Sequence, residues 1–443
     1  MRARVTRVPP KLKPLDLLLK SPLARNTGWM LVGQGLRLVI QALYFTMIAR
    51  SLGASKYGAF VGVVGLVGIF SPFGSLGSGY LLIKNVARDP RQFSANWGRA
   101  LSTTFFSSSV LFGIVALLSR FALPATIPLT VVLLVAASDL FGFSITEICG
   151  HAFLAFDRLK WTASITVLLG AGRLLAAIAL LCLNHNPSVP QWGAFYFGST
   201  AIVALVSLLL TLVKLGAPSF RFPRNPAEQR EGFFISLGKS AATIYNDLDK
   251  TMLARLGTLE ATGIYGAAYR LVDVGFSPVG SLLVAAYPNF MRAGVRGISA
   301  TLQYAKPLIL HALGYATVVT VLLLAGAGIV PYVLGSEYRL TVEALRWLAV
   351  LPMLRVVHFF LSDALAGAGY QGLKASIQIG VAVFNVLVNL WIIPAYSWRG
   401  AAWSSIASDT LLACAIGAVA LTLSRRSRAG TPEAEVLPAR AEA

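Results

Sequence analysis

The segment NTGWMLVGQGLRLVIQALYFTMIAR, residues 26–50, is long and apolar enough to cross a membrane as one helix, yet it carries Arg37 near its middle. At about 1.5 Å per residue, Arg37 lies roughly 16 Å from the start of the segment, too deep to reach the membrane surface easily. Charges at such a depth are costly and usually face a cavity, a substrate or a partner charge. The segment therefore predicts a membrane helix and a functional interior.

The composition of the whole chain matches this segment. Of its 443 residues, 56% are hydrophobic and 13% are charged, whereas a soluble domain has about 25% charged residues. The mean hydropathy is +0.70. Short loops separate about twelve segments of spanning length, which leaves no room for a soluble domain of about 100 residues. We predict an all-α membrane protein with spans at 26–50, 57–83, 99–120, 126–150, 161–183, 192–214, 232–256, 262–289, 305–333, 342–367, 373–394 and 399–423.

The formal net charge of +20 is distributed unevenly between the loops. In a soluble protein such a charge would indicate nucleic-acid binding. Here about 25 basic residues lie at the termini or in one set of alternate loops, and about 6 lie in the other set. Cytoplasmic loops of membrane proteins carry such an excess of Lys and Arg. The pattern predicts an even number of spans, both termini in the cytoplasm, and no nucleic acid as a partner.

A polar, proline-containing segment at residues 216–231 divides the chain near its midpoint. The halves share short motifs in the same order, and SPFGS at 71–75 recurs as SPVGS at 277–281. Two repeats of six spans have the same orientation, so we predict an internal parallel repeat. The predicted parts are a basic cytoplasmic leader, an N-terminal six-helix bundle, a cytoplasmic linker, a C-terminal six-helix bundle and a disordered cytoplasmic tail, at residues 1–25, 26–215, 216–231, 232–423 and 424–443.

The span at 26–50 carries a polar stripe. Gln34, Arg37, Gln41 and Tyr44 are spaced three, four and three residues apart, so they share one helix face. A guanidinium group binds phosphate oxygens in bidentate geometry, and we predict that this stripe binds an anionic substrate. The alternative is a structural salt bridge between Arg37 and Asp139 or Glu147.

Other spans carry cations at comparable depth, and we predict that these cations also bind the substrate: Arg173, Lys250, Arg270 and Arg355. Such an interior is mostly cationic, which suits an anionic cargo. The alternative is local pairing, because Asp247 lies three residues before Lys250 and Asp273 lies three residues after Arg270. Such pairs would leave little net charge.

Intramembrane carboxylates are candidates for ion coupling, and we predict this role for Asp249, Asp273 and Asp409. A carboxylate in a low-dielectric site exchanges protons more readily than an exposed one, because burial favours its neutral form. The alternative is that each carboxylate balances the charge of a neighbouring arginine.

The motifs of soluble catalysis lack their usual context. Asp247-Leu248-Asp249 has the DxD form of metal-dependent glycosyltransferases, but it lies inside a predicted span. No GxxxxGK[ST] motif occurs, so the chain has no ATP-hydrolysis site of that type. The four histidines and three cysteines are scattered without metal-ligand spacing. We expect no enzyme activity, no cofactor and no metal site.

Several short motifs resemble those of one transporter family. They are RSLG at 50–53 with YG at 57–58, DKTML at 249–253, GIYGAAYRL at 263–271 and LAGAG at 365–369. On these motifs, over roughly residues 25–423, the chain resembles the polysaccharide-export (O-antigen type) flippases of the multidrug/oligosaccharidyl-lipid/polysaccharide exporter superfamily.

The resemblance implies two six-helix bundles in a V around a central cavity. It implies a bacterial inner-membrane flippase that moves a polyprenyl-diphosphate-linked oligosaccharide by alternating access for cell-surface polysaccharide synthesis, driven by an ion gradient or the membrane potential. Membrane lipids and a polysaccharide polymerase or export machinery are the further partners that it implies. A diphosphate carries about two negative charges, which the buried cations can meet.

Alternatives to this function stay open. A drug/cation antiporter of the same superfamily usually holds its cation with acidic residues of the first bundle, whereas the span at 26–50 carries Arg37 and no carboxylate. A flippase of the peptidoglycan lipid precursor often has more spans. A membrane-embedded glycosyltransferase or polymerase usually has a large outer loop with catalytic residues, and every predicted outer loop here is short.

Overall fold

The computed structural model describes residues 22–220 and 226–429, and every regular element in these ranges is a helix, which confirms the predicted all-α class. The first half holds α2 (Pro22–Gly74), α3 (Ser78–Arg88), η1 (Pro90–Gln92), α4 (Phe93–Ala122), α5 (Leu129–Ala136), η2 (Ala137–Phe143), α6 (Ser144–Leu154), α7 (Leu159–Leu183) and α8 (Val189–Leu215). The second half holds α9 (Pro226–Leu256), α10 (Leu259–Gly294), α11 (Ile298–Gly326), η3 (Ala327–Ile329), α12 (Val330–Leu334), η4 (Ser336–Tyr338), α13 (Thr341–Leu348), α14 (Leu351–Gly367) and α15 (Gln371–Ala429).

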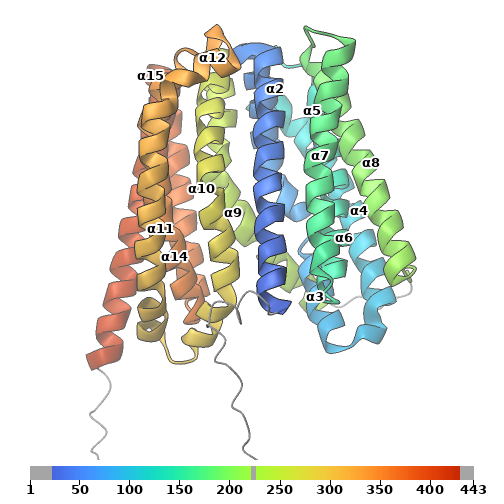
Figure 1. Ribbon diagram of the computed structural model, residues 1–443, viewed down its shortest axis with the longest axis vertical. Helices are drawn as coiled ribbons and strands as arrows, with labels where there is room; N and C mark the ends of the chain where they lie inside the picture. Colours follow the sequence, from blue (N-terminus) through green and yellow to red (C-terminus); the bar gives the residue numbers. More distant parts are fainter. Residues whose placement is uncertain (1–21, 221–225, 430–443) are drawn as a thin grey trace, which may run out of the picture.

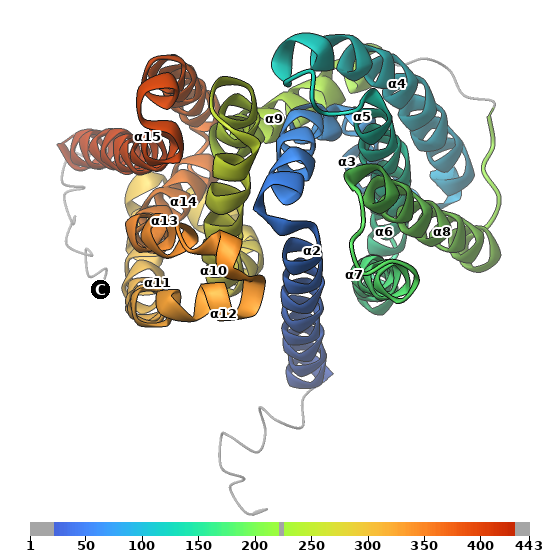
Figure 2. The ribbon, with the colours of Figure 1, turned by 90° about the horizontal axis from the view of Figure 1, so that it is seen from above.

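The long helices run roughly along one axis of the molecule (Figure 1). Seen from above, α10, α11, α13, α14 and α15 gather on one side and α3 to α8 on the other, with α2 and α9 between them (Figure 2). α2 packs against both α9 and α10, and α9 also packs against α15. The two halves are therefore separate groups of helices that meet along α2, α9 and α10.

Within the described ranges, nine helices are long and apolar enough to cross a membrane. Two of them contain a break in helical geometry: Leu38–Arg88 includes Gly53, with φ 72° and ψ 170°, and Gln371–Arg426 includes Ser397, with φ 52° and ψ −134°. Without a break, these segments of 51 and 56 residues would each be about 75 Å long or more, over twice the hydrocarbon thickness. The breaks let the chain turn, as α2 does at its upper end in Figure 1.

The helix predicted at 57–83 is interrupted, which corrects that expectation. α2 ends at Gly74, and Leu76 and Gly77 adopt positive φ angles of 45° and 67° before α3 begins. The SPFGS motif thus ends a helix, whereas SPVGS lies inside the continuous helix α10. Glycine adopts positive φ at little cost, and the position that corresponds to Gly77 in the second motif is Leu283. The shared motif therefore has a different local structure in each half.

The segment predicted as a linker at 216–231 is helical from Pro226 onward, because α9 begins there. Proline is favoured in the first turn of a helix, and Glu228 suits the positive end of the helix dipole. At the other end of the chain, α15 continues to Ala429, beyond the predicted end of the last span. The predicted leader, apart from residues 22–25 of α2, and the tail after residue 429 lie outside the described residues.

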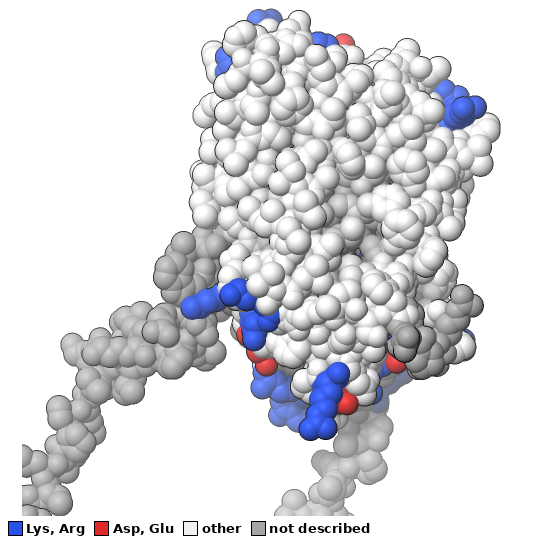
Figure 3. Space-filling view, turned by 90° about the vertical axis from the view of Figure 1, so that its right-hand side faces the viewer, with Lys and Arg blue, Asp and Glu red and all other residues white. Residues whose placement is uncertain are grey.

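Charged side chains lie mainly at the two ends of the molecule. On the face shown in Figure 3, Lys and Arg gather mostly at the lower end, and the flank between the ends is uncharged. This lower end, which we call the basic end, holds the connections after α3, α6 and α10, with Arg88, Arg158 and Arg296. The opposite end holds the breaks at Gly53 and Ser397. An apolar flank between charged ends is typical of a multi-pass membrane protein.

The two halves are in close contact at the opposite end. A carboxylate oxygen of Glu337 accepts a hydrogen bond from the backbone N–H of Ala54 at 2.9 Å, directly after the break at Gly53. A Cβ atom at Gly53 would lie 2.5 Å from that carboxylate oxygen, so a larger residue would displace the Glu337 side chain, and the φ of 72° itself favours glycine. Arg50 donates to the carbonyl of Tyr332 at 3.3 Å. This end of the molecule is therefore closed by contacts between the break in α2 and the short elements after α11.

Replacing Glu337 with alanine should loosen this closed end. The change removes a charge-assisted hydrogen bond worth about 1.5–3 kcal/mol, so the open fraction at this end should rise about tenfold or more. Spin labels at Ser55 and Arg339, exposed positions on the two sides of the contact, would then report a larger population at long distance by double electron–electron resonance.

Glu343→Ala is the matched control, because Glu343 is a carboxylate at the same end whose partner Arg399, at 3.0 Å, lies within the second half. Its distance distribution should match that of the unmodified protein. The same distribution in Glu337→Ala would mean that the contact with α2 does not hold the halves together.

Candidate functional site

A cavity of about 180 Å³, which we call the central cavity, lies between the two halves. Its wall is formed by α2, α7, α8, α9 and α10 and combines aromatic side chains with five charged ones: Arg173, Asp247, Lys250, Arg270 and Asp273. Charged groups inside an apolar protein are costly unless they meet partner charges, water or a ligand. The partners of each group therefore decide what the cavity can bind.

Arg173 of α7 lines the central cavity with its charge already balanced. Its Nη2 lies 3.3 Å from Oδ1 of Asp139, and its guanidinium lies 4.3 Å from the ring centre of Tyr196. The Tyr196 hydroxyl donates to the same carboxylate at 2.9 Å. Asp139 sits in the π-helical turn η2, a geometry that often occurs at functional sites. The sequence allows Asp139 as a salt-bridge partner of Arg37. In the structure, Asp139 is a partner of Arg173.

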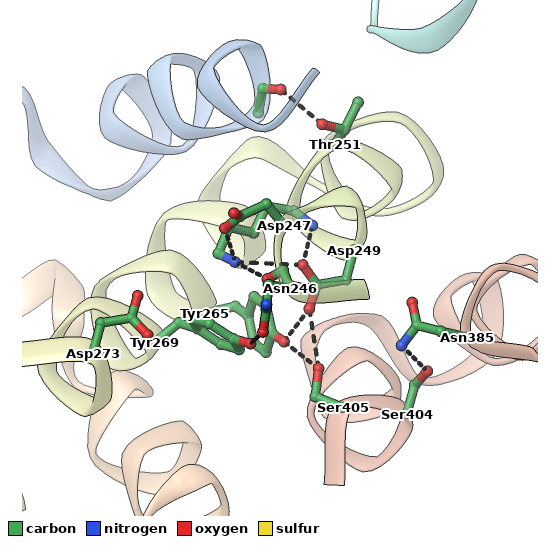
Figure 4. Close-up of polar contacts among 12 residues, drawn as sticks. Asn246, Asp247, Asp249, Thr251, Tyr265, Tyr269, Asp273, Asn385, Ser404 and Ser405 are labelled. Carbon is green, nitrogen blue, oxygen red and sulfur yellow. Dashed lines mark hydrogen bonds and ion pairs between the residues drawn. The ribbon is translucent and has the colours of Figure 1, made fainter. Parts of the chain in front are cut away.

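Lys250 of α9 is surrounded by acceptors of its own helix, and Figure 4 labels three of the residues that supply them, Asn246, Asp247 and Asp249. Its Nζ lies 2.8 Å from Oδ1 of Asp247 and 3.5 Å from Oδ1 of Asp249, and it donates to the Asn246 carbonyl at 2.6 Å. The same Nζ lies 3.7 Å from the ring centre of Tyr269. The local pairing with Asp247 that the sequence allows is present in the structure.

Asp249 is fully buried where α9, α10 and α15 meet. Its carboxylate accepts hydrogen bonds from the backbone N–H of Lys250 at 2.7 Å, from the Ser405 hydroxyl at 3.0 Å and from the Tyr265 hydroxyl. In Figure 4, Tyr265 and Ser405 point toward this carboxylate from two other helices. A buried carboxylate needs such donors to remain ionised. Asp249 lies behind the cavity wall and is linked to it through Lys250.

Arg355 of α14 joins three helices of the second half. Its guanidinium lies 2.8 Å from Asp273 of α10 and 3.4 Å from Asp409 of α15, and it donates a hydrogen bond to the Tyr269 hydroxyl. Only 4% of Arg355 and 3% of Asp409 is exposed. His358, one turn further along α14, has its Nε2 3.4 Å from Asp409. Arg355 is therefore the partner of two carboxylates and lies outside the wall of the central cavity.

Arg270 of α10 differs from the other cavity cations. It lines the central cavity, and no described residue forms a hydrogen bond, an ion pair or a ring contact with its guanidinium. Asp273, which the sequence allows as its partner, pairs with Arg355 instead. Among the described residues, Arg270 is thus the cation of the cavity wall that has no carboxylate partner.

α2 contributes Tyr44, the last residue of the predicted polar stripe, and Phe45 to the cavity wall. Gln41 is partly buried and lies outside this wall. The side chains of Gln34 and Arg37 lie outside the part of the chain that the structure describes. The predicted roles of these three residues therefore stay predictions.

The interior is closer to neutral than the sequence predicts. Among the described residues, Arg173, Lys250 and Arg355 each have at least one carboxylate within 3.5 Å. The predicted coupling residues Asp249, Asp273 and Asp409 belong to these pairs, as their alternative interpretation proposes. The physical reason is the cost of unpaired buried charge. Arg270 is the exception to this pairing.

Two tyrosines of α10, Tyr265 and Tyr269, complete the site, and the sequence did not identify them as site residues. Tyr265, Tyr269 and Asp273 are spaced four residues apart, so they share one face of α10, which points toward α9, α14 and α15. Arg270, one residue after Tyr269, lies on the cavity side of the same helix. The spacing of four is a signal in the sequence for the face that packs inside the second half, and Asp273 lies at the edge of this face, because it also lines the central cavity.

The sequence matches a family model. Residues 23–293 match the model described as polysaccharide biosynthesis protein. A comparison with curated proteins finds no significant match.

The fold is similar to that of solved transporter structures. An inward-facing multidrug resistance MATE transporter of the MOP superfamily is 15% identical, with a TM-score of 0.74 over 90% of this chain and 100% of that chain. The Lipid II flippase MurJ in an inward closed conformation is 10% identical, with a TM-score of 0.69 over 90% of each chain. An outward-facing MATE transporter is 15% identical, with a TM-score of 0.63 over 95% of this chain and 100% of that chain.

At these identities the solved structures show a common fold and do not specify a substrate. The family model, in contrast, is a match of sequence and concerns this chain directly. Since this model covers more than half of the chain, from residue 23 to residue 293, this multi-pass membrane protein belongs to the polysaccharide biosynthesis protein family.

Proposed function

We propose that this protein is a flippase that moves a polyprenyl-diphosphate-linked oligosaccharide from the cytoplasmic to the periplasmic leaflet of a bacterial inner membrane. Two findings support the proposal: the family match concerns polysaccharide biosynthesis, and the fold is shared with a flippase of a lipid-linked precursor. The observation that carries it is the pairing of a polar cavity with an adjoining apolar pocket.

This apolar pocket, of about 250 Å³, lies between α2, α10, α11 and α12. Phe45 belongs to its wall and also to the wall of the central cavity. Leu322 and Ile329 of the pocket are 64% and 60% exposed, so the pocket reaches the flank of the molecule. A substrate with a charged head and a hydrocarbon tail fits such a pair of spaces, with the diphosphate near Arg270 and the tail against apolar walls.

We propose twelve membrane spans in two bundles of six, in a V around the central cavity, and cytoplasmic termini at the basic end. The breaks at Gly53 and Ser397 support this count, because each divides a segment too long for one crossing, and α9 supplies a further long helix that is more polar than the nine. The excess of basic residues at one end supports the orientation. With this orientation the closed end faces the periplasm, in agreement with the higher TM-score against an inward-facing relative.

We propose that Asp249, Asp273 and Asp409 couple transport to an ion gradient. Each shares a buried cation with another group, and Lys250, held by Asp249, also lines the central cavity. Neutralising a carboxylate by a proton or a cation would release its partner cation toward the substrate. The carboxylate and the anionic substrate would then compete for the same positive charge, so ion uptake would favour substrate binding, which is a physical basis for coupling.

A drug/cation antiporter is the alternative on this fold. The observation that favours it is an excess of carboxylates in the second half, where four surround two cations: the buried Asp249 and Asp409 and the partly exposed Asp247 and Asp273 around Lys250 and Arg355. Two of these four carboxylates, Asp249 and Asp409, lie outside the wall of the central cavity. The wall itself carries three cations and two carboxylates, which favours an anionic substrate.

Lipid extracts from cells with and without the gene test the proposal. Deletion should cause accumulation of a polyprenyl-diphosphate-linked oligosaccharide, detected by mass spectrometry, and expression of the chain from a plasmid should reverse it. The mass of the accumulated lipid would constrain the composition of the glycan. Unchanged lipids, together with increased sensitivity to cationic drugs, would contradict the flippase and favour the antiporter.

A further inference from the structure

A second cavity, of about 860 Å³, lies at the basic end, away from the central cavity. It is formed by the first turns of α3, by α4 and by the first turns of α9. Its polar lining includes Asn96 and Arg99 of α4 and Glu228 and Arg230 of α9. We call this space the basal pocket. The proposed transport path does not pass through it, so it requires its own explanation.

The charges of the basal pocket do not cancel. Arg99 and Glu228 form an ion pair across the junction of α4 and α9. Arg230 has no carboxylate partner among the described residues, and its guanidinium lies 5.7 Å from the ring centre of Phe234. One positive charge is therefore available to a ligand.

A buried hydroxyl on the pocket wall also lacks a partner. Ser78, the first residue of α3, is 7% exposed, and its Oγ forms no hydrogen bond with any described residue. A buried hydroxyl without a partner costs about 1–3 kcal/mol, whereas a phosphate oxygen would accept its proton in a hydrogen bond. Arg230 and Ser78 thus offer a cation and a neutral donor to an anionic group.

The basal pocket continues into an apolar groove along α4. A smaller cavity of about 320 Å³ shares Ser102, Phe106 and Phe220 with it, and its other walls include Phe105 and Ile145. Phe105 and Phe106 are 61% and 69% exposed on the outer side of the first half, where α4 lies in Figure 2. The combined space therefore has a polar, cationic part at the basic end and an apolar part that extends along the flank.

We propose that the basal pocket binds an anionic glycerophospholipid of the leaflet at the basic end. Its phosphate would lie between Arg230 and Ser78, and one acyl chain would follow the groove past Phe106. The charge of the site, its position on a membrane-facing helix and its apolar continuation all match this lipid. The bound lipid would contact α3 and α4 of the first half and α9 of the second. It would thus stabilise the junction between the halves, independently of what the central cavity transports.

Other occupants match the site less well. The N-terminal leader carries basic residues and no acidic residue before Asp16, so its charge does not complement the pocket. The described chain ends with α15 at Ala429, on the opposite side of the molecule from α4 (Figures 1 and 2). A phospholipid, in contrast, is always present at this flank in a membrane.

Native mass spectrometry of the full-length protein tests the proposal. The probes are 1-palmitoyl-2-oleoyl phosphatidylglycerol and the phosphatidylcholine with the same acyl chains, offered as an equal mixture in vesicles before extraction. The unmodified protein should retain more phosphatidylglycerol than phosphatidylcholine. Arg230→Gln should lower its retention about fivefold, the usual effect of one basic residue on an anionic lipid. Arg91→Gln, an exposed cation at the same end outside the pocket, is the matched control and should retain the lipid normally.

A second variant tests the apolar part of the site. Ser102 lies on the wall of both cavities, so Ser102→Phe should block the passage between them and lower retention of both lipids. Equal thermal stability of all variants in phosphatidylcholine alone would show that each protein is folded. Equal retention of the two lipids by the unmodified protein, or equal loss in Arg230→Gln and Arg91→Gln, would overturn the proposal. Transport need not be measured, so the result is independent of the flippase proposal.

Discussion

Replacing Arg270 with alanine should reduce export of the lipid-linked glycan about tenfold or more, while the protein stays at its normal level in the membrane. Arg270 lines the central cavity and has no carboxylate partner among the described residues, unlike Arg173 and Lys250. Its guanidinium can therefore bind a diphosphate without first breaking an ion pair. Hydrogen bonds to charged groups contribute about 1.5–3 kcal/mol each, so losing one lowers affinity about tenfold or more.

The measurement is restoration of glycan export in a deletion strain, normalised to protein level by immunoblot. Arg270→Lys keeps the charge without the bidentate geometry and should retain partial activity. Arg255→Ala is the matched control and should leave export unchanged. Arg255 is an exposed cation of the same half, and it lies at the end of the molecule away from the basic end and outside the wall of the central cavity. Normal export by Arg270→Ala would remove Arg270 from the substrate site.

The same variant separates the flippase from the antiporter. Removing a positive charge from the cavity wall should weaken binding of a diphosphate but should strengthen, or leave unchanged, binding of a cationic drug. A fall in glycan export combined with unchanged drug resistance therefore supports an anionic substrate. A rise in drug resistance in Arg270→Ala would support the antiporter.

The helices of this protein can be read from its sequence because the membrane imposes a simple rule: each crossing needs a long apolar segment. The rule does not fix where the chain turns. Gly53 and Ser397 break helices through local backbone geometry, and Leu76 and Gly77 separate α2 from α3 where hydropathy alone continues. At Gly53 the turn is held by a tertiary contact, because Glu337 accepts a hydrogen bond from the backbone N–H of Ala54.

The candidate site was only partly predictable for a related reason. The pair of Lys250 with Asp247 is local, three residues apart on one helix, and the sequence indicates it directly. Arg355 and Asp273 are 82 residues apart in the chain, and their pairing depends on how α10 and α14 pack. Because Asp273 forms an ion pair with Arg355, it does not pair with Arg270, the local partner that the sequence allows. The distinction between a structural cation and a cavity cation thus emerges only from the packing.

Replacing Arg355 with methionine should destabilise the protein more than Arg270→Ala or Glu337→Ala does. Removing one partner of a buried ion pair costs about 3–5 kcal/mol, because the remaining charge stays buried without compensation. Here Asp409, whose side chain is 5% exposed, would keep only His358 nearby, and Asp273 would lose its cation. Denaturant titration in mixed micelles would measure the free energy of unfolding.

Two comparisons distinguish an uncompensated charge from lost packing. Arg399→Met breaks a pair whose side chains are 49% and 42% exposed, so it should cost about 0–1 kcal/mol. Arg355→Met combined with Asp409→Asn should recover part of the lost stability, because the double variant no longer buries a charge at residue 409. The single variant Asp409→Asn should remain folded, and if Asp409 couples transport to an ion gradient, its transport should no longer respond to that gradient. Both changes replace an arginine with methionine, one in a buried network and one at an exposed pair. A free energy of unfolding lowered by Arg355→Met no more than by Arg399→Met would therefore show that the buried network contributes little to stability.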